Sequence, residues 1–127
     1  MIKFRAWYMP FGKYGAMQEM VYSRASHILA LAETEPEKYI PEQFAGLSDV
    51  NGKDIYEGDI LAISYMIDED KVTDYLKVEW REDYAGFYCG EKPLYACLSE
   101  WDNDIKLAQT YPKIFGNVHE NPEISEE

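Results

Sequence analysis

The feature that most constrains this 127-residue chain is the stretch from Ala45 to Ile60, which reads AGLSDVNGKDIYEGDI. Asn51-Gly52 is a strong two-residue turn signal, because both residue types accept positive φ at little cost. Glu57-Gly58-Asp59 supplies a second turn, and an apolar strand pattern runs from Ile60 to Tyr65. A Gly-Asp turn that leads into an apolar strand is typical of the first strand of a small β-barrel.

Three carboxylates lie in or beside these turns, at Asp49, Glu57 and Asp59. Turns favour acidic residues because a carboxylate accepts hydrogen bonds from nearby backbone N–H groups. We therefore interpret these residues as structural and keep a catalytic role as the less favoured alternative. The stretch predicts a fold, and neither it nor any other part of the sequence determines what the protein does.

Further strands are predicted downstream by alternating apolar and polar residues. We expect strands at 59–66, 75–81, 86–89 and 114–118, and either a strand at 95–98 or a helical turn ending near Trp101. The strands are short and separated by turns, and their number fits an SH3-like barrel extending from about Leu47 to Val118. The residues expected in its core are Ile60, either Ile63 or Leu61, Val78, Trp80, Phe87, Ile114 and Val118.

The N-terminal part predicts two strands, at 2–7 and 17–23, joined by a loop at 10–15. Residues 24–33 are ambiguous: they fit a short helix capped by Ser26 or a short buried strand, and Pro36 ends either element near Glu35. The residues Glu33, Glu35, Glu37 and Glu42 form an acidic connector that we interpret as a solvated loop. A short strand at 43–45 then enters the central turn.

The predicted fold class is therefore mainly β with minor α. Residues 1–46 form an N-terminal subdomain of strands and a short helix, and residues 47–127 form the SH3-like small β-barrel.

Three segments carry a family resemblance: 2–7 (IKFRAW), 46–60 and 115–123 (FGNVHENPE). The central segment combines Gly46-Leu47, Asp49, Asn51-Gly52-Lys53 and Ile55-Tyr56-Glu57-Gly58-Asp59-Ile60. Together they resemble the signature of the YopX-like proteins, small proteins encoded by bacteriophages and by prophages of Gram-positive bacteria. The segments from about 8 to 44 and from 66 to 112 do not carry the resemblance. It implies a phage origin and a small-barrel C-terminal part, and it implies no activity.

The net charge of −12 argues against nucleic-acid binding through phosphates and against an anionic membrane surface. It suits either solubility or a basic protein partner. The N-terminus has no signal-peptide pattern, and the longest aliphatic run, Ile28–Ala32, is too short to span a bilayer. We expect a cytoplasmic location, in the host bacterial cell if the phage origin holds, with Cys89 and Cys97 as free thiols.

The sequence offers little support for catalytic chemistry. Cys89 or Cys97 with His119 could form a thiol–imidazole pair, but such cysteines more often pack as small hydrophobes. Two cysteines and two histidines far apart argue against structural zinc, and the acidic loop after Asp68 lacks the calcium-loop pattern. We predict no catalytic, cofactor-binding or metal-binding residue and no cofactor, and we leave enzymatic activity open while favouring a non-enzymatic role.

Aromatic residues make up 15% of the chain, more than a core of this size needs. They indicate either a protein interface or tyrosines whose rings pack against the protein while their hydroxyl groups contact water. Some of the following are expected to be exposed: Tyr8, Phe11, Tyr14, Tyr22, Tyr56, Tyr65, Tyr84, Tyr88, Tyr95, Trp101 and Tyr111.

The leading hypothesis is an uncharacterised phage or prophage accessory protein that acts by protein contact. The alternatives are an acidic DNA mimic that inhibits a host DNA-binding protein, and a hydrolase that uses dispersed carboxylates and His119. We expect a homo-oligomer with an unknown host or phage partner, because the N-terminal part is too small to bury its own apolar side chains. These side chains are Ile2, Phe4, Met17, Met20, Val21, Ile28, Leu29 and Leu31.

Overall fold

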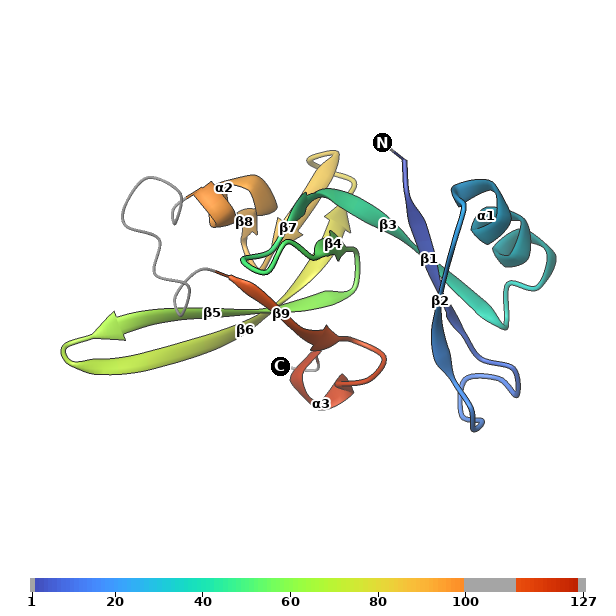
Figure 1. Cartoon of the computed structure of the whole chain (residues 1–127), viewed down its shortest axis with the longest axis horizontal. Coiled ribbons are helices and arrows are strands. Elements are labelled where there is room, and N and C mark those ends of the chain that lie inside the picture. The colour runs from blue at the N-terminus through green and yellow to red at the C-terminus, as the bar shows by residue number, and fades with distance from the viewer. Residues whose placement is uncertain (1, 100–111, 126–127) are drawn as a thin grey trace. The chain divides into compact units, whose positions relative to one another are not determined.

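The computed structural model describes residues 2–99 and 112–125 of the chain (Figure 1). The chain divides into two compact units, Met1–Phe44 and Ala45–Glu127. The elements are, in order, β1 (Phe4–Tyr8), β2 (Glu19–Ser23), α1 (Ala25–Thr34), β3 (Tyr39–Ser48), β4 (Asp54–Tyr56), β5 (Asp59–Ile67), β6 (Asp70–Arg81), β7 (Gly86–Cys89), β8 (Lys92–Pro93), α2 (Leu94–Ser99), β9 (Lys113–Asn117) and α3 (Pro122–Ser125). The prediction of a mainly β fold with minor α is confirmed.

The first unit contains an antiparallel sheet with β1 in the middle. β2 pairs with one side of β1 and the first half of β3 pairs with the other, so that Ala6 lies opposite both Val21 and Pro41. Because side chains alternate along a strand, these three residues share one face of the sheet. The two strands predicted in this part are confirmed.

The ambiguous segment after β2 is the helix α1, which contacts β1 and β2. Its alanines and leucines are strong helix formers, and Ile28 is fully buried. The proposed cap at Ser26 is wrong: Ser26 lies inside the first turn, and the capping position is Arg24, whose side chain makes no cap hydrogen bond. The helix ends at Glu35, whose N–H donates to the carbonyl of Leu31, directly before Pro36.

The acidic connector is only in part the solvated loop that the sequence predicted: Glu35 and Glu37 lie between α1 and β3, and Glu37 is exposed. Glu33 belongs to α1, and Glu42 belongs to β3, where it lies opposite Arg5. Glu42 is only 4% exposed, and its Oε1 accepts a hydrogen bond of 2.8 Å from Nε of Arg5, which is also 4% exposed. An ion pair on neighbouring strands thus lets a carboxylate enter the sheet, which composition alone could not indicate.

The loop between β1 and β2 is held by the side chain of Gln18. Its Oε1 accepts a hydrogen bond of 2.8 Å from the indole N–H of Trp7. Its Nε2 donates to the carbonyls of Lys13 and Gly15 at 2.9 and 3.0 Å. The loop is therefore fixed from inside, while Tyr14 at its tip is 93% exposed.

The second unit contains an antiparallel sheet with the order β8-β7-β6-β5-β9. β5 and β6 form the long hairpin in Figure 1, and β9 returns from the far end of the chain to pair with β5. Within the described residues, β8 and β9 are the edges of this sheet. Its closure into an SH3-like barrel stays a prediction.

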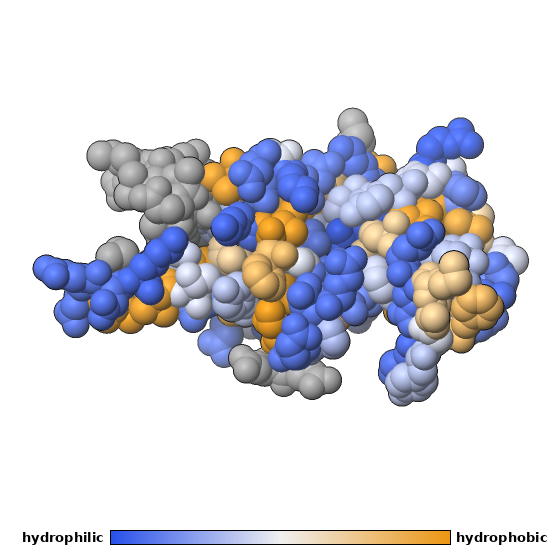
Figure 2. Space-filling view, turned by 60° about the horizontal axis from the view of Figure 1, so that its bottom comes forward, coloured by the Kyte–Doolittle hydropathy of each residue, from blue (hydrophilic) through white to orange (hydrophobic). Residues whose placement is uncertain are grey.

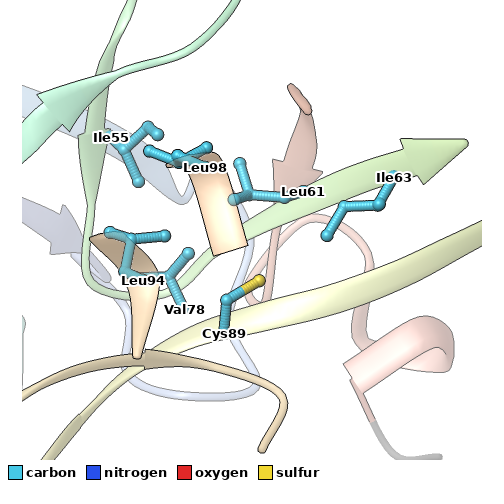
Figure 3. Close-up of a cluster of buried hydrophobic side chains, with 7 residues drawn as sticks. All are labelled: Ile55, Leu61, Ile63, Val78, Cys89, Leu94 and Leu98. Carbon is cyan, nitrogen blue, oxygen red and sulfur yellow. The ribbon is translucent and has the colours of Figure 1, made fainter. Parts of the chain in front are cut away.

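One cluster of aliphatic side chains forms the core of the second unit (Figure 3). It gathers side chains from β4, β5, β6, β7 and α2, and the partly buried Phe87 and Ile114 pack against it. The segment expected as a strand or a helical turn at 95–98 is the helix α2; Trp101 lies outside the described residues. The cluster consists of Ile55, Leu61, Ile63, Val78, Cys89, Leu94 and Leu98.

Three members of the expected core, Val118, Trp80 and Ile60, lie outside this cluster. Val118 follows β9 and is only half-buried. Trp80 is 42% exposed: it follows Val78 near the end of β6, where its ring meets Phe87 edge-on at 5.1 Å. Ile60 is fully buried but is not part of the cluster, because it alternates with Leu61 and so points to the opposite face of the sheet. The alternation was predicted correctly along β6, although the core covers less of this strand than expected. Along β5 the prediction placed Ile60 on the wrong face.

Breaking the ion pair in the first sheet is expected to destabilise the protein strongly. Glu42→Gln should cost about 3–5 kcal/mol, the range for leaving one buried charge without its counter-charge. Urea denaturation followed by circular dichroism measures this loss. Glu33→Gln, on the exposed surface of α1, is the matched control and should change stability by less than about 0.5 kcal/mol. Equal losses in both variants would contradict the burial argument.

Leu61 and Trp80 differ in exposure, and we expect their replacement by alanine to differ in its effect on stability. Leu61→Ala should cost about 2–5 kcal/mol, because it removes a fully buried side chain. Trp80→Ala should cost only about 1 kcal/mol, roughly the worth of one aromatic pair. Denaturant titration of both variants gives the comparison, and a larger loss for Trp80→Ala would place this residue in the core after all.

Candidate functional site

The central turn is organised by the carboxylate of Asp49, which is only 5% exposed. Its Oδ1 accepts hydrogen bonds from the backbone N–H groups of Asn51 and Lys53, both at 2.9 Å. Its Oδ2 accepts another from the N–H of Ile114 at 2.9 Å. One side chain thus closes the Asn51-Gly52 turn and also connects it to β9. All three bonds hold backbone in place.

The second turn is held in a similar way by Asp59, which is 2% exposed. Its Oδ2 accepts a hydrogen bond of 2.8 Å from the N–H of Tyr56. Gly58, with φ of +89°, donates its N–H to the carbonyl of Val78, and its carbonyl accepts from the N–H of Val118. The Gly-Asp turn therefore joins β6 to the segment after β9.

The closing segment after β9 uses two asparagines. The Oδ1 of Asn117 accepts hydrogen bonds from the N–H groups of His119 and Glu120, both at 3.0 Å. The Oδ1 of Asn121 accepts a hydrogen bond of 3.3 Å from the N–H of Asn117. A Cβ added to Gly116 would lie only 2.0 Å from this oxygen. Position 116 therefore has room only for glycine while Asn121 stays in place.

The thiol–imidazole pair gains no support from these positions. Cys89 is 1% exposed and packs among the aliphatic side chains of the core, whereas His119 belongs to the turn after β9. The side chain of Cys97 lies outside the described residues. Among residues 2–99 and 112–125, no group of three or more His, Cys, Asp or Glu side chains is arranged to hold a metal ion.

A different kind of surface lies on the face of the five-stranded sheet that points away from the core. Along β6, the residues that alternate with buried Val78 are Tyr75, Lys77, Glu79 and Arg81. The ring of Tyr75 meets that of Phe115 on β9 at 4.8 Å, and these residues are 43% and 48% exposed. We call this surface, defined by Tyr75, Lys77, Glu79, Arg81 and Phe115, the outer face. Figure 2 shows one side of the molecule, on which hydrophobic side chains lie between hydrophilic ones.

The outer face continues across β7 through a cation–π cluster. The guanidinium of Arg81 lies 5.0 Å from the ring centre of Tyr88 and 5.4 Å from that of Tyr84, and the two rings are 5.2 Å apart. Each such contact contributes about 0.5–1 kcal/mol at an exposed site. These contacts favour one arrangement of the three side chains although Tyr84 is 62% exposed.

A groove of about 240 Å³ runs beside these residues. Buried Ile60 forms part of its lining, and the ammonium of Lys77 lies 3.6 Å from the carboxylate of Glu79 beside it. A groove that combines aliphatic, aromatic and paired charged groups suits a peptide or protein surface. Its lining residues are Ile60, Tyr75, Leu76, Lys77, Glu79, Gly90 and Ile124.

Sequence reasoning found part of the exposed aromatic set, including Tyr84 on the outer face, and missed the pair of Tyr75 and Phe115. Phe11, Tyr14, Tyr22, Tyr84 and Tyr95 are exposed as expected, whereas Tyr56 is buried. Tyr75 and Phe115 were not among the candidates, although Tyr75 alternates with Leu76 and Val78, a signal that could have placed it on the outer side. The side chains of Tyr65, Trp101 and Tyr111 lie outside the described residues.

The arrangement described so far, two β-rich units with buried turn carboxylates and an exposed aromatic face, carries no recognisable catalytic centre in the described residues. A family model described as "YopX protein" matches residues 3–126. The chain therefore belongs to the YopX family, and the resemblance found in the sequence is confirmed.

Among solved structures, the chain is similar to protein EF1440 from Enterococcus faecalis. The sequences are 21% identical, the similarity covers 97% of this chain and 96% of that one, and the TM-score is 0.57. At this identity the similarity concerns the fold alone. No curated protein matches the chain. Within the described residues, no helix has the length and apolar character needed to cross a membrane.

The carboxylate of Asp49 provides a test of the structural interpretation. Asp49→Asn should cost about 1–3 kcal/mol, because the amide nitrogen cannot accept a hydrogen bond and must face at least one buried backbone N–H. Thermal unfolding of the full chain measures the loss. Asp70→Asn, the same change at an exposed position, controls for the altered net charge. Unchanged stability of Asp49→Asn would contradict the structural role.

Proposed function

We propose that this member of the YopX family is a non-enzymatic protein-binding module of phage or prophage origin. It acts in the cytoplasm of the host bacterium as a homo-oligomer and contacts a host or phage protein. The observation that carries the proposal is the outer face, where exposed aromatic and charged side chains already contact one another. Tyr, Trp and Arg are the residue types that dominate binding energy at protein interfaces.

The contacts among the side chains of the outer face matter for binding, because they favour one arrangement of these side chains. A side chain that is already held in one arrangement loses less conformational entropy when a partner covers it. The ring pair of Tyr75 and Phe115 and the stacking of Arg81 on Tyr84 and Tyr88 provide such order. The surface is thus prepared for contact before any partner arrives, which supports a role in recognition.

Exposed apolar side chains of the first unit support the homo-oligomer. Large apolar side chains scattered singly are ordinary, but here they recur along one small unit. Their exposed fractions are 73% for Ile2, 70% for Phe11, 77% for Met17, 63% for Tyr22, 43% for Leu29 and 38% for Ile40. A second copy of the chain is the simplest cover for them, since two-fold pairing is the commonest assembly of soluble chains.

Protein contact fits these observations better than DNA mimicry. A DNA mimic needs carboxylates on the surface, spaced like phosphates. Glu42, Asp49 and Asp59 contribute to the net charge of −12 but are 4%, 5% and 2% exposed, and they hold the fold together. On the outer face itself, Glu79 is paired with Lys77 and Asp83 with Arg81, each at 3.6 Å.

The proposal predicts that the outer face is needed for partner capture. In affinity capture from host lysate, the double variant Tyr75→Ala/Phe115→Ala should lose proteins that the native chain retains, because removing a central aromatic residue typically costs about 2 kcal/mol or more of binding free energy. Tyr95→Ala, at a tyrosine that is 69% exposed on α2, is the control and should retain them. An identical set of captured proteins for the native chain and the double variant would contradict the proposal.

A further inference from the structure

We propose that β2 is the strand through which two copies of this chain associate, forming a continuous antiparallel sheet across a two-fold axis. The inference rests on the proposed homo-oligomer and specifies its interface. β2 is the outer strand of the sheet in the first unit, next to β1. An outer strand presents a row of backbone N–H and C=O groups along one side, which can pair with another strand.

The sheet edges of the protein differ in how they are protected. β4 has only three residues, and β8 consists of Lys92 and Pro93, the two residue types that most often block edge pairing. β9 carries an irregularity where its register against β5 shifts between Ile60 and Leu61. β2 has five residues in an unbroken register with β1 and contains neither lysine nor proline. By these criteria, β2 is the edge best suited to pairing.

The side chains along β2 are accessible. Glu19, Tyr22 and Ser23 are exposed, with Tyr22 63% exposed, and Met20 and Val21 are half-buried. No charged side chain interrupts the strand between Glu19 and Ser23. A strand approaching this edge would therefore meet apolar and small polar groups.

Symmetry fixes the register of the pairing. A two-fold axis perpendicular to an antiparallel sheet passes between a residue and its own copy, and full overlap of β2 places that axis at Val21, the middle residue. Met20 of each copy then lies opposite Tyr22 of the other copy, so the interface contains two such pairs. A thioether beside an aromatic ring is a favourable contact, and cross-strand pairs of this kind contribute about 0.2–1 kcal/mol each.

The charges agree with an antiparallel copy. β2 begins at exposed Glu19, and exposed Arg24 follows directly after its last residue. Antiparallel pairing about Val21 brings the acidic end of one copy toward the basic end of the other, at both ends of the interface. A parallel arrangement would place Glu19 beside its own copy, and like charges on adjacent strands are destabilising.

A cysteine introduced at the symmetry axis tests the register in the full chain. Opposite residues of an antiparallel pair have Cα atoms about 4.5–5.5 Å apart, within the range for a disulfide. Val21→Cys should therefore form a cross-linked dimer under mild oxidation. Glu19→Cys is the matched control: its two copies would be four residues out of register, about 13 Å apart, and should not cross-link. The native chain, oxidised in the same way, is the control for any cross-link formed by Cys89 or Cys97.

Sedimentation equilibrium at micromolar concentration gives a second measurement that needs no cross-link. The native chain should show twice the 14.8 kDa of one chain. Tyr22→Lys should return the mass to that of one chain, because a lysine on an edge strand opposes pairing. Tyr14→Lys, the same change at a tyrosine that is 93% exposed on the β1–β2 loop, should remain a dimer, and circular dichroism checks that each variant is folded.

The outcomes distinguish the interface from the proposed function. A native dimer, cross-linking of Val21→Cys alone and a monomeric Tyr22→Lys would support the interface. A native dimer in which Val21→Cys does not cross-link and Tyr22→Lys stays dimeric would overturn the β2 interface while leaving the proposed homo-oligomer. A monomeric native chain would overturn both.

Discussion

The second unit depends above all on the carboxylate of Asp49. It lies 65 residues before Ile114 in the chain, yet its two oxygens bind the N–H groups of its own turn and of β9 together. An asparagine side chain, with one acceptor oxygen, could accept from some of these N–H groups but not from all three. Because β9 pairs with β5, and β5 supplies Leu61 and Ile63 to the core, the position of this carboxylate affects the whole sheet.

The residues that identify the family are therefore mainly those that hold backbone in place. Asp49, Asp59 and Asn117 each direct side-chain oxygens at backbone N–H groups, Gly58 adopts a positive φ, and Gly116 allows the chain to pass close to Asn121. A motif of this kind preserves a scaffold without defining a reaction. The family model matches residues 3–126 and therefore includes both these turns and the strands β6 and β7 of the outer face.

The sequence predicted local structure well and long-range contacts poorly. The alternation of Leu76 and Val78 with polar residues predicted β6, and Gly58-Asp59 predicted the turn before β5. The burial of Glu42 depends on Arg5, which is 37 residues away, and the exposure of Trp80 depends on how far the core extends along β6. Neither can be derived from residue order alone. The pair of Tyr75 and Phe115 was missed for the same reason, since these two residues meet only through the pairing of β5 with both β6 and β9.

The contact between Gly116 and Asn121 has a consequence for how members of this family can diverge. Any side chain at position 116 would meet the Asn121 amide, and moving that amide would remove the acceptor for the N–H of Asn117. A side chain at position 116 is therefore compatible with this turn only if Asn121 has moved or changed, whereas position 121 can change while glycine remains at 116. Divergence at position 116 should consequently come after divergence at position 121.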